Sequence, residues 1–123
     1  MDNRLERLAS WKQQAQDLTH ALRAGDDPFM IRVREIIAER GLDPQKMACV
    51  SAFDDMLDHY LGILILENGS AIEFELDFHE IPARSARLIY WQPAAQGTKN
   101  LSAGLLAAGR ELLEQERDVR KSD

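Results

Sequence analysis

Cysteine is almost absent from this 123-residue chain, and so are long apolar runs. The single cysteine, Cys49, rules out an internal disulfide and a cysteine-based zinc cluster. Its neighbours Ala48 and Val50 are small and apolar, so we expect a buried core residue rather than a reactive thiol. The longest apolar run, Leu61–Leu66, is far too short to span a bilayer.

The first ten residues, MDNRLERLAS, contain neither the apolar core nor the cleavage site of a signal peptide. We therefore expect a cytoplasmic protein that does not associate with membranes. A mass of 14.0 kDa is ordinary for one domain and is sufficient to bury one core. Residues 1–123 are accordingly expected to form a single domain.

The sequence also lacks the short motifs that accompany common chemistries. No glycine-rich phosphate loop, GxSxG elbow, HExxH pair, EF-hand loop or Cys-His zinc spacing occurs. We expect a protein without enzymatic activity and without a cofactor.

The net charge of −6 is unevenly distributed along the chain. Residues 1–40 contain seven basic and seven acidic residues, residues 41–80 contain one and nine, and residues 81–123 contain seven and five. Such an acidic middle third disfavours nucleic acid there and favours a basic partner or a cation. Solvated acidic side chains without any partner are the simpler interpretation.

Two apolar-rich runs flank the dipeptide Asn68-Gly69, which favours a two-residue type I′ turn because both turn residues need φ > 0. The pattern predicts a β-hairpin over residues 59–78. In an antiparallel pair joined this way, Ile63 lies opposite Phe74 on a face that belongs in the core. The opposite face then carries the candidate interaction surface, which consists of Tyr60, Glu73, Glu75 and Asp77.

Helix signals precede the hairpin. Gly25 suits the end of a first helix, and Asp27 and Pro28 suit the N-cap and first position of a second one, which should end at Gly41. Because the link between them is short, we expect a helical hairpin over residues 3–41.

Aromatic and β-branched residues at 87–92 predict a third strand that runs antiparallel to the second. Arg87 should then lie near the acidic row, which consists of Glu73, Glu75 and Asp77 along the second strand. Residues 46–52 suit either a strand or part of a helix that starts at Asp43-Pro44. The fold class is therefore α+β, with an antiparallel sheet of three or four strands. The expected segments are the sheet at 47–92, a loop at 96–100, a C-terminal helix at 101–119 packed on the sheet, and a frayed tail at 120–123.

Two glycines of the C-terminal helix, Gly104 and Gly109, each cost about 1 kcal/mol relative to alanine. Together with neighbouring alanines they leave a smooth surface. We expect another element to approach the helix closely there.

Carboxylates and imidazoles gather at the open end of the predicted hairpin. The extrapolated register sets Asp58 opposite His79, so these groups could hold a divalent cation or form a carboxylate-oriented histidine. The spacing matches no named metal motif, and aspartates are common in turns, so we do not assign a metal. The candidate ligands would be Asp55, Asp58, Asp77 and His79.

These features together predict a small protein-interaction module that forms a homodimer. The dimer is expected because a sheet face with Tyr60, Leu64 and Leu66, and a narrow apolar seam on the first helix, both need cover. One alternative is an immunity protein or antitoxin whose acidic face blocks a basic partner. Others are a nucleic-acid-binding regulator that uses Arg32 and Arg34, and a metal-dependent enzyme with its site at the open end of the hairpin.

Overall fold

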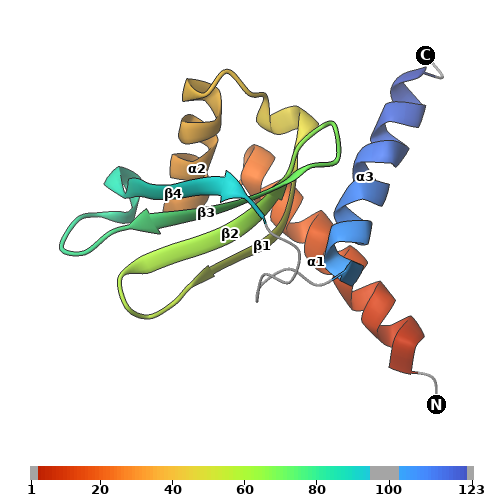
Figure 1. The fold of residues 1–123 in the computed structure, drawn as a ribbon, viewed down its shortest axis with the longest axis horizontal. Helices are drawn as coiled ribbons and strands as arrows, with labels where there is room; N and C mark the ends of the chain where they lie inside the picture. Colours follow the sequence, from red (N-terminus) through yellow and green to blue (C-terminus); the bar gives the residue numbers. More distant parts are fainter. Residues whose placement is uncertain (1–2, 95–102, 122–123) are drawn as a thin grey trace.

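The computed structural model describes residues 3–94 and 103–121, and within these ranges it is an α+β protein (Figure 1). Its four strands form one antiparallel sheet in the order β1-β2-β3-β4, and α3 packs on the sheet, as the sequence predicts. The elements are α1 (Asn3–Ala24), α2 (Pro28–Glu39), the 3₁₀ turn η1 (Pro44–Lys46), β1 (Ala48–Asp54), β2 (His59–Ile65), β3 (Ala71–Asp77), the 3₁₀ turn η2 (Ala83–Ser85), β4 (Arg87–Pro93) and α3 (Ala103–Lys121).

Residues 46–52, for which the sequence allowed a helix or a strand, begin in the 3₁₀ turn η1 and continue into the strand β1. Asp43 accepts a hydrogen bond from the backbone N–H of Gln45 and starts η1, and β1 follows directly. α3 continues to Lys121, two residues beyond the predicted end. The loop predicted at 96–100 lies outside the described residues.

The junction of α1 and α2 forms as its sequence signals indicate. Asp27 accepts a hydrogen bond from the N–H of Met30, and Pro28 is the first residue of α2. The end of α1 has a further stabilising contact, because the Arg34 guanidinium donates hydrogen bonds to the carbonyls of Ala21, Leu22 and Gly25. A cation at a helix C-terminus satisfies free carbonyls and complements the helix dipole.

α1 lies along the free edge of β1. The Thr19 hydroxyl accepts a hydrogen bond from the N–H of Cys49 and donates one to its carbonyl. Gln14 donates to the carbonyl of Val50, and Arg23 donates to that of Met47. Side chains of α1 therefore replace the missing neighbouring strand, which leaves the edge protected.

Both faces of the sheet carry buried apolar residues. The inner cluster lies between the sheet and α2 and comprises Leu22, Met30, Val33, Ile36, Ile37, Met47, Cys49, Tyr60, Leu64, Phe74, Leu76 and Ala86. The outer cluster lies between the sheet, α1 and α3 and comprises Ala15, Ala48, Val50, Ile63, Ile65, Ala108 and Leu113. Burial raises the pKa of the Cys49 thiol to about 12, so this cysteine is a core residue, as predicted.

The two glycines of α3 allow the close approach that the sequence predicts. The ring of Trp11 lies where a Gly104 side chain would project, and Val50 and Ile65 lie against Gly109. Two arginines of α3, Arg110 and Arg117, donate hydrogen bonds to carbonyls of the β2–β3 turn.

The predicted hairpin forms, but its predicted register is wrong by one residue. His59 pairs with Asp77, Gly62 with Phe74 and Ile63 with Glu73. A shift of one residue moves one strand's side chains to the opposite face relative to its partner. Tyr60 therefore does not share a face with the acidic row.

The turn explains the shift. Only Gly69 of the turn has a positive φ, of 89°, and the N–H of Gly69 donates to the carbonyl of Leu66. This geometry matches a three-residue loop with a glycine bulge instead of a type I′ turn. Gly62 fits the resulting register, because a side chain there would meet the ring of Phe74.

The corrected register places Tyr60 in the inner cluster. The Tyr60 side chain is buried and stacks on Phe29 of α2, with ring centroids 4.3 Å apart, and burial raises the pKa of its phenol. Tyr60 is thus a core residue, and its assignment to the interaction surface was wrong.

β4 is the other edge of the sheet. Its pairing with β3 shifts between Glu75 and Leu76, which leaves Ile89 as an extra residue, and the strand ends in Pro93. Ala94 donates to the carbonyl of Ala71, so by the alternation of an antiparallel ladder the backbone of Pro93 faces away from β3. A bulge and a proline both interrupt the hydrogen-bonding capacity of this edge.

None of the helices in the described part of the chain combines the length and the apolar content that a membrane span requires.

We predict that Gly62→Ala lowers the free energy of unfolding by about 2 kcal/mol, because the new methyl group would lie 2.5 Å from the Phe74 ring and from the Ser51 carbonyl. Urea denaturation followed by circular dichroism measures the change. In the double variant Gly62→Ala/Phe74→Leu, the free energy of unfolding should fall by less than the sum of the decreases in the two single variants. Strictly additive decreases would contradict the contact between residue 62 and the Phe74 ring.

We also predict that Arg34→Met lowers the free energy of unfolding by about 2 kcal/mol, because it leaves the last carbonyls of α1 without their charged donor. Amide hydrogen exchange should increase first in the last turn of α1. An unchanged unfolding midpoint would show that water replaces the guanidinium without cost.

Candidate functional site

Three cross-strand rows of side chains lie on the outer face of the sheet, beyond the row of Ala48, Ile65 and Ala71 that belongs to the outer cluster. The middle row is Phe53, Leu61, Glu75 and Tyr90, one residue from each strand. On the side of the β2–β3 turn lies the row of Ser51, Ile63, Glu73 and Gln92. On the opposite side lie His59, Asp77 and Arg87. The acidic row runs along β3 and forms as the sequence indicates. Its cross-strand neighbours on β2 are Ile63, Leu61 and His59.

α3 covers only the end of this face near the β2–β3 turn, where Gly109 contacts Val50 and Ile65 (Figure 1). Phe53 and Tyr90 remain 39% and 41% exposed. We call these two residues, together with Glu73, Glu75 and Asp77, the open outer surface. No helix in the described part of the chain lies over it.

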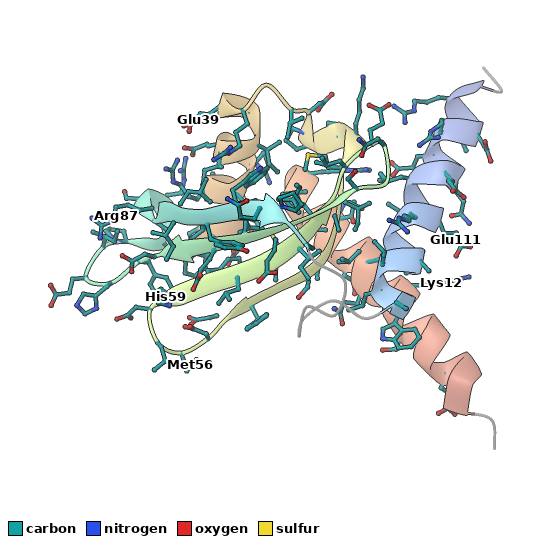
Figure 2. All side chains as sticks on the ribbon, viewed as in Figure 1. Lys12, Glu39, Met56, His59, Arg87 and Glu111 are labelled. Atoms are coloured by element: carbon teal, nitrogen blue, oxygen red, sulfur yellow. The ribbon has the colours of Figure 1, made fainter. Side chains whose placement is uncertain are left out.

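The β1–β2 loop extends from one end of the open outer surface, with Met56 at its tip (Figure 2), and presents Met56 and Leu57 to solvent. These side chains are 84% and 75% exposed, more than any other large apolar residue of the described chain. Asp54 accepts a hydrogen bond from the N–H of Met56, and Asp55 accepts from those of Leu57 and His59. The loop is therefore held in one conformation, with Met56 at a φ of 66°, a value that bulky residues rarely adopt.

His59 lies among three carboxylates. Its Nδ1 is 3.4 Å from Asp55 Oδ2 and 3.4 Å from Glu75 Oε1, and its Nε2 is 4.0 Å from Asp77 Oδ1. Asp77 also accepts a hydrogen bond of 3.0 Å from Arg87. The predicted proximity of Arg87 to the acidic row is confirmed at this residue.

The expected meeting of Asp58 and His79 also occurs, with Asp58 Oδ2 2.6 Å from His79 Nδ1. Both side chains are largely exposed, at 48% and 65%, and connect two loops at the open end of the hairpin. Among the described residues, no group of three histidine, cysteine, aspartate or glutamate side chains is arranged to hold a metal. The candidate ligands are instead divided between two places: Asp58 contacts His79, whereas Asp55 and Asp77 lie beside His59, and Asp77 also binds Arg87.

Two of the carboxyl groups have lowered pKa values. Partial burial acts to raise the pKa of Asp55, but hydrogen bonds from the N–H groups of Leu57 and His59, together with the His59 ring, lower it overall. The N–H of His79 and the Arg87 guanidinium lower the pKa of Asp77. Both groups are therefore stabilised in their charged form.

The arginines considered for nucleic-acid binding make contacts within the protein. Arg34 binds carbonyls at the end of α1, and Arg32 donates to the carbonyl of Ala86 and pairs with Glu35. Arg40 stacks over the ring of Trp91 at 4.6 Å. Arg32 and Arg34 are therefore engaged in contacts that hold the fold together.

The two features that led us to expect a homodimer are covered within one chain. Tyr60 and Leu64 lie beneath α2 in the inner cluster. The seam of α1 packs on the sheet through Ala15 and Leu22, and Trp11 packs on α3. The homodimer therefore stays a prediction, but neither of these two surfaces is left exposed to favour it.

Comparisons of the chain with protein-family models, with curated proteins and with solved structures found no match.

We predict that Asp77 stabilises the fold only while it is charged. Because its pKa is lower in the folded state, the contribution is complete above the unfolded-state value of about 4 and is lost as the pH falls through the folded-state pKa. Urea denaturation should show Asp77→Asn to be less stable than the unsubstituted protein at neutral pH, with the difference shrinking in acid.

Arg87→Met is the matched control for this experiment. Its loss of stability relative to the unsubstituted protein should depend on pH in the same way but be smaller, because the N–H of His79 still binds Asp77. A stability difference that stays constant between neutral and acidic pH would contradict the assignment.

Proposed function

We propose that this protein is a protein-interaction module without enzymatic activity, and that the open outer surface binds a basic, amphipathic segment of another protein. The observation that supports this proposal best is the middle row of the outer face. There, exposed Phe53 and Tyr90 are combined with Glu75 on a surface that no described helix covers.

The chemistry of the surface defines the partner. The exposed Phe53 and Tyr90 lie at the two ends of the middle row, and their apolar surface favours a partner with apolar residues, since such groups gain free energy when they leave water. Glu75 lies between them and Glu73 lies in the next row, and among the described residues no arginine or lysine pairs with either carboxylate. Lysine or arginine beside the partner's apolar residues would compensate these charges and accelerate association.

A second copy of this chain suits the surface less well. In a two-fold symmetric dimer the same patch faces itself, so Glu73 and Glu75 would meet their own counterparts. Like charges brought together in an interface cost free energy. We therefore propose a different, basic protein as the partner of this surface, and any homodimer would use another face.

An inhibitor of a basic enzyme or toxin is the second candidate, and the β1–β2 loop favours it. Met56 and Leu57 project from a loop that hydrogen bonds to Asp54 and Asp55 hold in place. A loop ordered before binding loses little conformational entropy when it enters a pocket. Acidic residues on both sides of the projecting pair suit a pocket with a basic rim.

A defined peptide tests the proposal. We predict that an 18-residue helical peptide of leucine and lysine, with leucine on one face, shifts the NMR signals of Phe53, Glu75 and Tyr90 in the ¹⁵N-labelled chain. Binding should weaken as salt rises, and Glu73→Lys/Glu75→Lys should lower the affinity at least about tenfold.

The double variant Glu39→Lys/Glu114→Lys makes the same change in net charge at exposed sites on α2 and α3, and should bind nearly as well. The variant Met56→Ser/Leu57→Ser tests the β1–β2 loop. If it lowers the affinity for the peptide more than Glu73→Lys/Glu75→Lys does, the result favours the inhibitor. The proposal would be contradicted if a peptide of leucine and glutamate bound as tightly as the peptide of leucine and lysine. It would also be contradicted if the two double lysine variants lost affinity for the peptide equally.

A further inference from the structure

A separate cavity of about 740 Å³ lies between α1 and α3, away from the open outer surface. The two helices cross where Trp11 packs on Gly104 and diverge toward the C-terminal end of α3 (Figure 1). We call this space the interhelical groove. The lining residues that matter below are His20 and Arg23 of α1 and Leu112, Glu116, Val119 and Arg120 of α3.

The floor of the groove is a fixed ion pair. Arg23 donates two hydrogen bonds to the carboxylate of Glu116, at 2.5 and 2.9 Å, and also binds the carbonyl of Met47. The Arg23 side chain is only 16% exposed. The pair therefore links α1 to α3 and to the residue that precedes β1.

The walls are partly apolar. Leu112 lies in the groove, and Val119, which is 65% exposed, continues the same stripe of α3 beyond the ion pair. A volume of 740 Å³ is within the range of small-molecule sites, which are typically lined by apolar surface with a few polar groups.

The rim has the opposite charge to the open outer surface. Two arginines and a histidine line the groove against a single glutamate, in a chain whose net charge is −6. Arg23 and Glu116 satisfy each other. His20 and Arg120 form no hydrogen bond or ion pair with another residue of the described chain, so their donors are available to a ligand.

We infer that the interhelical groove binds a small amphipathic carboxylate, an anion with an aliphatic or aromatic body. The carboxylate would accept hydrogen bonds from Arg120 and His20 at the rim. The apolar body would lie on Leu112 and Val119. The apolar wall and the cationic rim together support this choice. An inorganic anion would not contact the apolar wall, and a neutral apolar molecule would not bind the cationic rim.

Decanoate is a suitable probe for the intact chain. We expect it to shift, in a saturable manner, the NMR signals of the lining residues, including the side-chain amides of Gln16 and Gln115. Decyltrimethylammonium has the same body with the opposite charge and should bind at least about tenfold more weakly.

Two exposed positions allow substitution without disturbing the core. Arg120→Glu should lower the affinity for decanoate at least about tenfold, because it reverses the charge of the rim. Val119→Asn should also weaken binding, because it removes the outer part of the apolar wall. Arg84→Glu makes the same charge change on η2, where Arg84 pairs with Glu35, and should leave binding unchanged.

Three results would overturn the inference. They are the absence of saturable shifts with decanoate, equal binding of the cationic probe, and equal losses in Arg120→Glu and Arg84→Glu. An acidic helical peptide that occupies the groove where decanoate does not would assign the site to a protein segment instead. Denaturation curves of each variant confirm that the fold is retained.

Discussion

The contact between α1 and the free edge of β1 determines the rest of the architecture. Thr19, Gln14 and Arg23 satisfy backbone groups that a further strand would otherwise bind. With α1 fixed along this edge, its apolar residues reach around the strand and enter both the inner and the outer cluster. α3 then packs on Trp11 and the outer cluster, so the position of the C-terminal helix also depends on the edge contact.

Features determined by nearby residues could be predicted from the sequence. The cap at Asp27, the strand at 87–92 and the close packing at Gly104 all follow from local chemistry. The hairpin register could not be predicted, because β2 is apolar on both faces and both carry a buried cluster, so burial does not distinguish two registers that differ by one residue. The glycine within β2, Gly62, was the available signal, since it marks a close approach of another side chain.

The candidate site was predicted in part. The acidic row and the meeting of Asp58 with His79 follow from the hairpin alone, and a one-residue shift hardly changes them. The neighbours of the acidic row were missed, because Phe53 and Tyr90 reach it only through pairing across all four strands. The arginine contacts could not be predicted either, since their acceptors are backbone carbonyls whose positions depend on the completed fold.

The two edges of the sheet share one further property. One is occupied by side chains of α1, and the other contains a bulge and ends in Pro93. A strand of a neighbouring molecule therefore finds no uninterrupted ladder at either edge of the described sheet, which disfavours pairing between the sheets of two chains. The chain can consequently expose aromatic and aliphatic side chains without offering a regular edge to a second strand.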